Sequence, residues 1–223
     1  MGKNPYFIAE ISSNHCGNFD RAKELILSAK KFKADAVKLQ TFTPSSMTFN
    51  SKNKIFRIKS GLWKGHNYWD LYKKAHTPYE WHQELFQYAK TLKLTLFSTP
   101  FDDTAVDLLE NLNCPIYKVA SFEITDLPLI KKIARTNKPM IISTGMANLN
   151  EINVAVKIKQ VEILRAVKST KSGINARKNT VPLMLVILTK KPFKNEFKGL
   201  KVSFKLPLEV AICSIFLSHC ITP

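Results

Sequence analysis

The stretch TLFSTPFDDTAVDLLENLNCPIYKVASFEITDLPLIKKIARTNKPMIIST, residues 95–144, alternates between two hydrophobic periods. Its short apolar runs, each of strand length, are 95–99, 116–120 and 140–144. The intervening segments, 102–112 and 126–135, repeat apolar residues at helical spacing. Strands that alternate with helices in this way lie parallel and are joined by right-handed crossovers. The stretch therefore predicts a parallel α/β sheet.

The same rhythm extends toward both ends of the chain. Strands are predicted at 6–11 and 34–41, and helices at 20–32, at about 78–92 and from 149 onward. Thr77 is predicted to cap the helix at 78–92, with Pro78 at its first position. These elements make five βα units, which fit either an open doubly wound sheet or a (β/α)8 barrel.

Polar residues choose between these two folds. They lie at or just beyond the C-terminal ends of five different predicted strands: Glu10, Lys38, Gln40, Thr99, Lys118, Ser121, Glu123 and Ser143. A barrel brings all of its strand ends to one rim, whereas an open sheet binds its ligand at one switch point, usually with a glycine-rich loop. The sequence has no such glycine motif. It predicts an α/β fold of the (β/α)8 TIM-barrel type, although a single Lys or Glu near a strand end can also be merely solvated.

The predicted barrel is incomplete, because the pattern degrades after about residue 157. Residues 157–223 contain 13 Lys and Arg, three Glu and no Asp. The run VPLMLVIL (181–188) can pass for a strand, but no sixth βα unit is legible, and a barrel typically needs about 250 residues. We therefore divide the chain into a barrel part, 1–156, and an anomalous basic tail, 157–223. The composition of the tail resembles out-of-frame translation, so a frameshift is our hypothesis for it.

Net charge and hydropathy limit the kinds of partner that the protein can have. The net charge is +17, but ten of these charges come from the tail, which makes nucleic-acid binding the disfavoured explanation. The excess of positive charge in the rest suits an anionic metabolite. The aromatic and basic residues of 44–76 could stack on bases, but a self-packed lid over the barrel mouth is favoured. The apolar run 206–217 is shorter than the ~20 residues of a membrane span, and no signal peptide is evident, so a cytoplasmic protein is expected.

Five motifs resemble the sialic acid synthase family. They are FIAEISSNHCG (7–17), DAVKLQTFTP (35–44), LFSTPFD (96–102), YKVASFEITDLPLI (117–130) and PMIISTGMANLNEI (139–152). The resemblance covers residues 6 to about 156 in order. Within the family, FRIKSGLWKG (56–65) and ASFE (120–123) are similar to the pseudaminic acid synthase branch.

The resemblance implies a bacterial cytoplasmic enzyme that condenses phosphoenolpyruvate with a 2,4-diacetamido-2,4,6-trideoxy hexose. The products are pseudaminic acid, used in flagellin glycosylation, and phosphate. It assigns phosphoenolpyruvate to Lys38, Thr99, Lys118, Ser121 and Ser143. It assigns the sugar to Gln40, and it makes Glu10 and Glu123 the catalytic carboxylates that orient water and move protons. The alternative role of the two carboxylates is to hold Lys38 or Lys118 by an ion pair.

The departures from the family are equally informative. The family uses a divalent metal, Mn or Mg, held by histidines in Ser-Asp-His-Thr and Glu-Lys-His-Phe motifs, and neither motif occurs here. His219 is the only histidine beyond residue 82, and its neighbours match neither motif, so no metal ligands are predicted. The C-terminal antifreeze-like domain of the family, which completes the site of the partner in a homodimer, is also absent. We expect a truncated chain that is inactive as written. An N-acetylneuraminate or legionaminate synthase and a noncatalytic, pseudogene-like fragment are the alternatives.

Overall fold

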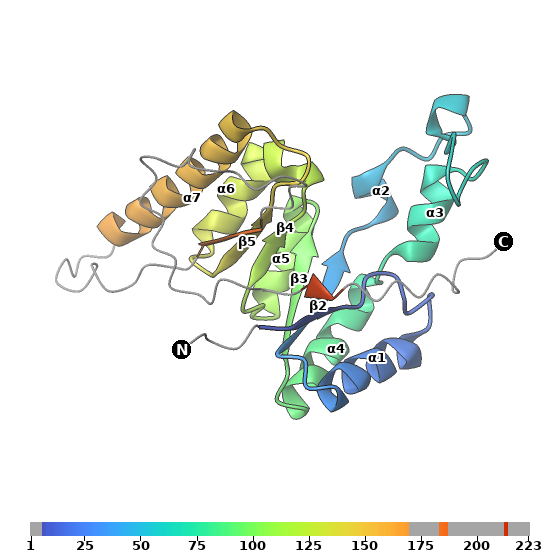
Figure 1. Ribbon diagram of the computed structural model, residues 1–223, viewed down its shortest axis with the longest axis horizontal. Coiled ribbons are helices and arrows are strands. Elements are labelled where there is room, and N and C mark those ends of the chain that lie inside the picture. The colour runs from blue at the N-terminus through green and yellow to red at the C-terminus, as the bar shows by residue number, and fades with distance from the viewer. Residues whose placement is uncertain (1–5, 170–182, 187–211, 214–223) are drawn as a thin grey trace. The chain divides into compact units, whose positions relative to one another are not determined.

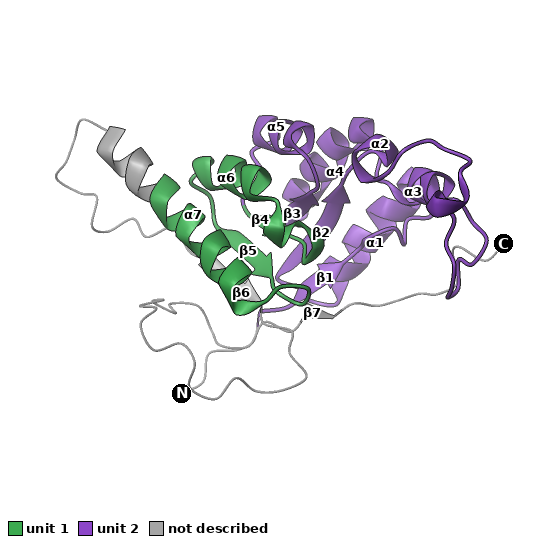
Figure 2. Ribbon diagram, turned by 90° about the horizontal axis from the view of Figure 1, so that it is seen from above, with its two compact units in different colours: residues 1–5, 116–209 green, residues 6–115, 210–223 purple. Residues whose placement is uncertain are grey.

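The computed structural model describes residues 6–169, 183–186 and 212–213 (Figure 1). The chain divides into two compact units (Figure 2). Unit 2 comprises Tyr6–Pro115 and Val210–Pro223, and unit 1 comprises Met1–Pro5 and Ile116–Glu209. The predicted site residues are shared between the two units.

Unit 2 is built on parallel strands. They are β1 (Ile8–Glu10), β2 (Ala36–Thr41), β3 (Thr95–Pro100) and β7 (Ile212–Cys213). β2 pairs with β1 on one side and with β3 on the other, and β7 pairs with the free side of β1. Three helices follow these strands in sequence: α1 (Phe19–Lys31), α4 (Tyr79–Thr91) and α5 (Asp103–Asn111).

The core of unit 2 fixes the direction of the site residues. Val37 and Leu39 of β2 are fully buried against apolar residues of α1 and α4, such as Ile26 and Leu85. The two helices lie side by side in Figure 1. Because successive residues of a strand point to opposite faces, Lys38 and Gln40 point away from these helices. The helical core therefore determines on which face the polar side chains gather.

The N-terminus of α4 differs from the prediction. Pro78, not Thr77, occupies the N-cap position, and no side chain caps the helix. The buried hydroxyl of Thr77 instead lies 3.2 Å from Nε2 of His15, which comes from the turn after β1. A short-range cap was wrong here because a tertiary partner 62 residues away takes the hydroxyl.

The segment 44–76 is partly helical and packs on itself. It contains α2 (Pro44–Met47), η1 (Lys54–Phe56) and α3 (Tyr68–Ala75). Its aromatic rings pair within the segment: Phe49 with Phe56, Trp63 with His66, and Tyr68 with Tyr72. The self-packing agrees with the prediction, whereas the role of a lid stays a prediction.

Unit 1 continues the parallel pattern. Its strands are β4 (Tyr117–Val119), β5 (Met140–Ser143) and β6 (Leu183–Val186), and β5 pairs in parallel with both of the others. The helical elements are η2 (Phe122–Thr125), α6 (Leu127–Arg135) and α7 (Leu149–Ser169). Buried residues of α6 and α7, among them Ile133 and Ala155, supply the core. β6 falls within the run 181–188, so the middle of that run, Leu183–Val186, does form a strand.

The predicted boundary at residue 157 lies inside α7, which continues to Ser169. Lys159 is fully buried and its ammonium donates to the carbonyl of Lys138 at 2.9 Å. Glu162, 5% exposed, accepts a hydrogen bond from Nε of Arg135 at 3.1 Å. The first residues of the tail are thus part of the packed helix. Local polar partners accommodate charges that the sequence pattern could not place.

The structure bears on two further sequence features, the tail histidine and the absence of a predicted membrane span. His219, and most of the apolar run 206–217, lie outside the described residues. Among the helices that the structure describes, none is long and apolar enough to cross a membrane.

The buried imidazole of His15 predicts a pH-dependent stability. Burial lowers the pKa of His15 to about 4, from an ordinary value of 6.5. Between these two pH values, His15 is therefore protonated in the unfolded chain and neutral in the folded chain. His15 contributes stability above pH 6.5 that is lost as the pH falls toward 4. We expect His15→Gln to remove about 2 kcal/mol of the loss in unfolding free energy between pH 7.5 and 5.0, measured by urea titration.

The control is His66→Gln, because His66 is only partly buried. It should leave the pH dependence as in the wild type. A His15→Gln chain that retained the full pH dependence would contradict the assignment.

Candidate active site

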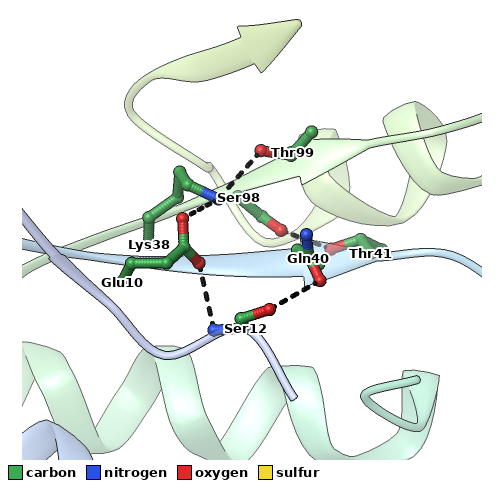
Figure 3. Close-up of polar contacts among 7 residues, drawn as sticks. All are labelled: Glu10, Ser12, Lys38, Gln40, Thr41, Ser98 and Thr99. Atoms are coloured by element: carbon green, nitrogen blue, oxygen red, sulfur yellow. Dashed lines mark hydrogen bonds and ion pairs between the residues drawn. The ribbon is translucent and has the colours of Figure 1, made fainter. Parts of the chain in front are cut away.

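Four of the predicted site residues meet in unit 2. Glu10 ends β1, Lys38 lies in the middle of β2 with Gln40 nearer its end, and Thr99 lies near the end of β3. The strand register places Glu10 beside Lys38 and Gln40 beside Thr99. The ammonium of Lys38 forms an ion pair with Oε2 of Glu10 and donates to Oγ1 of Thr99 at 3.2 Å (Figure 3). The carboxyl ends of three adjacent strands therefore converge on one cation.

Lys38 is a buried cation with one hydrogen-bond donor that the described residues leave unused. The residue is 3% exposed, and its burial lowers the pKa of the ammonium while the neighbouring carboxylate of Glu10 raises it. An ammonium has three N–H donors, and within the described residues Glu10 and Thr99 take two of them. The third N–H is available to a ligand. A desolvated cation of this kind binds an anion more strongly than a lysine in water does.

Ser12 is a part of this group that the sequence did not reveal. Its backbone N–H donates to Oε1 of Glu10 at 3.0 Å, and its hydroxyl donates to Oε1 of Gln40 at 3.2 Å (Figure 3). Both oxygens of Glu10 are thereby engaged, one by Ser12 and the other by Lys38. A serine two residues after a strand carries no sequence signal for this role.

A buried relay holds the ends of β2 and β3 together. Nδ1 of His82 faces the carbonyl of Pro78 at 3.0 Å, so Nδ1 carries the proton. Burial lowers the pKa of His82, and the neutral ring accepts at Nε2 from the hydroxyl of Thr41 at 2.9 Å. The hydroxyl of Ser98 must then donate to Thr41, 2.6 Å away (Figure 3). Since Thr41 and Ser98 adjoin Gln40 and Thr99, this relay fixes the strand ends that carry the site.

The other four predicted residues lie in unit 1. Lys118 is in β4, Ser121 follows that strand, Glu123 is in η2 and Ser143 ends β5. Ser143 is 5% exposed, and the others are partly buried. Oε2 of Glu123 is buried and has no hydrogen-bond partner among the described residues. Burial raises the pKa of Glu123, and the charge of Lys118 lowers it.

The geometry thus gathers the predicted residues into two groups. Glu10, Lys38, Gln40 and Thr99 are linked by contacts within unit 2. In unit 1, Glu123 and Lys118 interact electrostatically, and Ser143 lies on the neighbouring strand β5. Each group lies at the carboxyl ends of its own strands, where ligands of parallel α/β folds bind.

A divalent metal does not fit the residues that the structure describes. Within them, no three His, Cys, Asp or Glu side chains lie together in a way that could hold an ion. His15 and His82, buried on the described part of the chain, use their ring nitrogens in hydrogen bonds with protein groups. We therefore derive no step through a metal.

Solved structures share this architecture. The crystal structure of N-acetylneuraminic acid (sialic acid) synthetase from Leptospira borgpetersenii superposes with a TM-score of 0.64 at 25% identity, over 87% of this chain and 58% of that one. The spore coat polysaccharide biosynthesis protein SpsE from Bacillus subtilis superposes with a TM-score of 0.56 at 30% identity, over 84% and 46%. These neighbours have folds of the (β/α)8-barrel type, which confirms the predicted fold class.

Curated relatives are similar over the same region. Pseudaminic acid synthase from Helicobacter pylori is 52% identical over 69% of this chain and 45% of its own length. For pseudaminic acid synthase from Campylobacter jejuni the identity is 43%, over 67% and 44%. The chain thus spans less than half the length of these relatives. The model of the NeuB family matches residues 25–186, most of the described chain, and the chain therefore belongs to the NeuB family.

Proposed function

We propose that this chain carries the phosphoenolpyruvate-binding part of a pseudaminic acid synthase. The observation that carries the proposal is the gradient of similarity: 52% identity with pseudaminic acid synthase from Helicobacter pylori, and 39% with N,N'-diacetyllegionaminic acid synthase from Campylobacter jejuni. The complete reaction would condense phosphoenolpyruvate with a 2,4-diacetamido-2,4,6-trideoxy hexose. Legionaminate and N-acetylneuraminate synthesis are the alternatives within the family.

The charges of the site suit phosphoenolpyruvate. This substrate brings a phosphate and a carboxylate, and their burial must be offset by fixed cations and hydrogen-bond donors. Lys38 offers a desolvated ammonium, and the partly buried Lys118 of unit 1 adds a second positive charge. The hydroxyls of Thr99, Ser121 and Ser143 add neutral donors. We assign these five residues to phosphoenolpyruvate and Gln40 to the sugar.

The reaction that we propose forms one carbon–carbon bond and replaces the carbon–oxygen bond to phosphate with a carbon–oxygen bond from water, whose oxygen becomes the keto oxygen of the product. The proton that the water gives up balances the proton that the aldehyde oxygen takes up as it becomes a hydroxyl. The terminal enol carbon attacks the aldehyde carbon of the open-chain sugar, and water adds at the carbon that carries the phosphate. The bond from that carbon to the phosphate oxygen then breaks and inorganic phosphate leaves. Glu123 is the better candidate to accept the proton of the water, because its raised pKa and unpartnered oxygen suit proton transfer. Glu10 acts by holding Lys38.

Activity of these 223 residues alone is a separate matter. Within the residues that the structure describes, no group of side chains fits the metal that the family is expected to use. We therefore propose that the chain binds phosphoenolpyruvate but does not complete the condensation. A cytoplasmic homodimer that serves flagellin glycosylation is our proposal for the whole protein. A noncatalytic binding protein is the alternative candidate.

Removing the two lysines should weaken phosphoenolpyruvate binding. We expect Lys38→Ala and Lys118→Ala each to cost about 2 kcal/mol, roughly thirtyfold in dissociation constant, because each removes a charged hydrogen-bond donor. Isothermal titration of phosphoenolpyruvate into each variant measures the loss. The control is Lys31→Ala at the exposed end of α1. Unchanged affinity in both site variants would refute the assignment.

The Glu10–Lys38 pair predicts a double-mutant pattern. Glu10→Gln leaves a buried ammonium without its counter-ion and should lower the unfolding free energy by about 3 kcal/mol. Adding Lys38→Met removes the stranded charge and should restore most of that stability. Urea unfolding of the two single variants and the double variant measures the coupling. If Glu10→Gln were as stable as the wild type, Glu10 would not be the anchor of Lys38.

Glu123 predicts the opposite effect on stability. Its pKa is raised in the folded state, so its stabilising contribution is present below the ordinary value of 4.5 and is lost as the pH rises. Glu123→Gln should therefore be more stable than the wild type at pH 7 and equally stable near pH 4. The matched control is Glu84→Gln, an exposed carboxylate on α4. A loss of stability at pH 7 would show that Glu123 has a structural partner.

A further inference from the structure

Ser12 has a backbone conformation that its surroundings must impose. Its φ is +48°, in the left-handed region that side chains other than glycine rarely adopt. Of the five other non-glycine residues with positive φ, Cys16 lies in the same turn as Ser12. The other four each follow a helix by two residues, where this conformation ends the helix: Lys33, Lys93, Asn113 and Asn137. Ser12 follows a strand, so helix termination does not explain it.

The turn that holds Ser12 is fixed on both sides. The backbone N–H of Ile11 donates to the carbonyl of Lys38 at 3.1 Å, and that of Asn14 donates to the carbonyl of Ile11 at 3.0 Å. Within the turn, His15 is fully buried, with its Nδ1 accepting from the N–H of Gly17 at 3.1 Å. Strain of this kind persists only where the rest of the structure determines the backbone, and it concentrates at functional sites.

The strained turn brings two donors of Ser12 onto two site residues. The N–H meets Glu10, and the hydroxyl meets the carboxamide oxygen of Gln40, 28 residues away in the chain. Because the oxygen of Gln40 is engaged, the NH2 of its carboxamide is the end left for a ligand (Figure 3). An NH2 group can only donate hydrogen bonds. A ligand group at this point must therefore accept them.

We propose that Ser12 is a positioning residue that sets the orientation of the Gln40 carboxamide, so that Gln40 recognises a carbonyl oxygen of an acetamido group. The inference rests on the proposed function in one respect, the assignment of Gln40 to the sugar. The orientation of the carboxamide depends only on Ser12. Ser12 touches no reacting atom and acts through Gln40.

The first test measures the order of the Gln40 side chain by 15N NMR of the full chain. The NH2 signals of Gln40 are identified as the pair that Gln40→Met removes. We expect their heteronuclear NOE to be high in the wild type. In Ser12→Ala and in Ser12→Gly it should fall to the level of the exposed Gln83, since both variants lack the hydroxyl. Comparing the two variants separates the loss of the hydroxyl from the backbone strain, because glycine also relieves the strain.

Ser13→Ala is the matched control, since Ser13 lies in the same turn. Within the described chain, Ser13 donates no hydrogen bond to Glu10 or to Gln40. It should leave the Gln40 signals as in the wild type. A Gln40 pair that stays ordered in Ser12→Ala would overturn the positioning role, whatever the protein binds.

The second test compares two sugars that differ only in their acetyl groups. We expect the 2,4-diacetamido-2,4,6-trideoxy hexose to move the Gln40 NH2 protons downfield and the corresponding diamino sugar to leave them in place. Ser12→Ala should weaken the diacetamido sugar about tenfold and leave phosphoenolpyruvate affinity unchanged. Equal shifts with both sugars, or equal losses for sugar and phosphoenolpyruvate, would overturn the acetamido assignment.

The two tests fail separately. If the wild-type chain binds phosphoenolpyruvate but neither sugar moves Gln40, the proposed sugar role of Gln40 and the acetamido assignment are both wrong. The NOE measurement still decides whether Ser12 orients Gln40.

Discussion

Lys38 can stay charged inside the protein because the carboxylate of Glu10 lies against it on the neighbouring strand. Burial lowers the pKa of the ammonium of this lysine, which is only 3% exposed, and the carboxylate of Glu10 acts in the opposite direction and raises it. The ion pair also explains the contacts that surround it. Glu10 is oriented by the N–H of Ser12, and Lys38 is directed by the hydroxyl of Thr99. The strand ends of unit 2 are therefore arranged around the Glu10–Lys38 ion pair. The site can bind an anion because one N–H of the Lys38 ammonium is left without a protein partner among the described residues.

The pair works only if three strand ends keep their register. The buried relay from Ser98 through Thr41 to His82 ties β2 and β3 to α4, directly beside Gln40 and Thr99. On the other side, the turn after β1 is anchored by His15 against Thr77. The ring nitrogens of His15 and His82 are thus engaged by protein groups. Both are neutral structural residues, because burial lowers the pKa of each and their nitrogens face protein groups.

Much of this arrangement could be predicted from the sequence, because hydrophobic period and strand-end polarity are local signals. The element bounds agree with the predicted ones to within about two residues along most of 6–143. The Glu10–Lys38 pair was one of two roles considered for Glu10. The sequence could not reveal Ser12, since a positive φ and a contact 28 residues away leave no trace in periodicity. It misjudged Thr77 for the same reason. The boundary predicted at 157 lies within α7, where Lys159 and Glu162 have polar partners.

A crystal structure of this chain grown with phosphoenolpyruvate would test the central claim most directly. That claim is that the buried ammonium at the carboxyl ends of β1, β2 and β3 is an anion-binding centre. The account predicts a phosphate or carboxylate oxygen of the substrate within hydrogen-bond distance of Nζ of Lys38, with the Glu10 ion pair and the Ser12 contacts intact. Phosphoenolpyruvate bound elsewhere on the chain, with the Lys38 ammonium still satisfied only by protein groups, would contradict it.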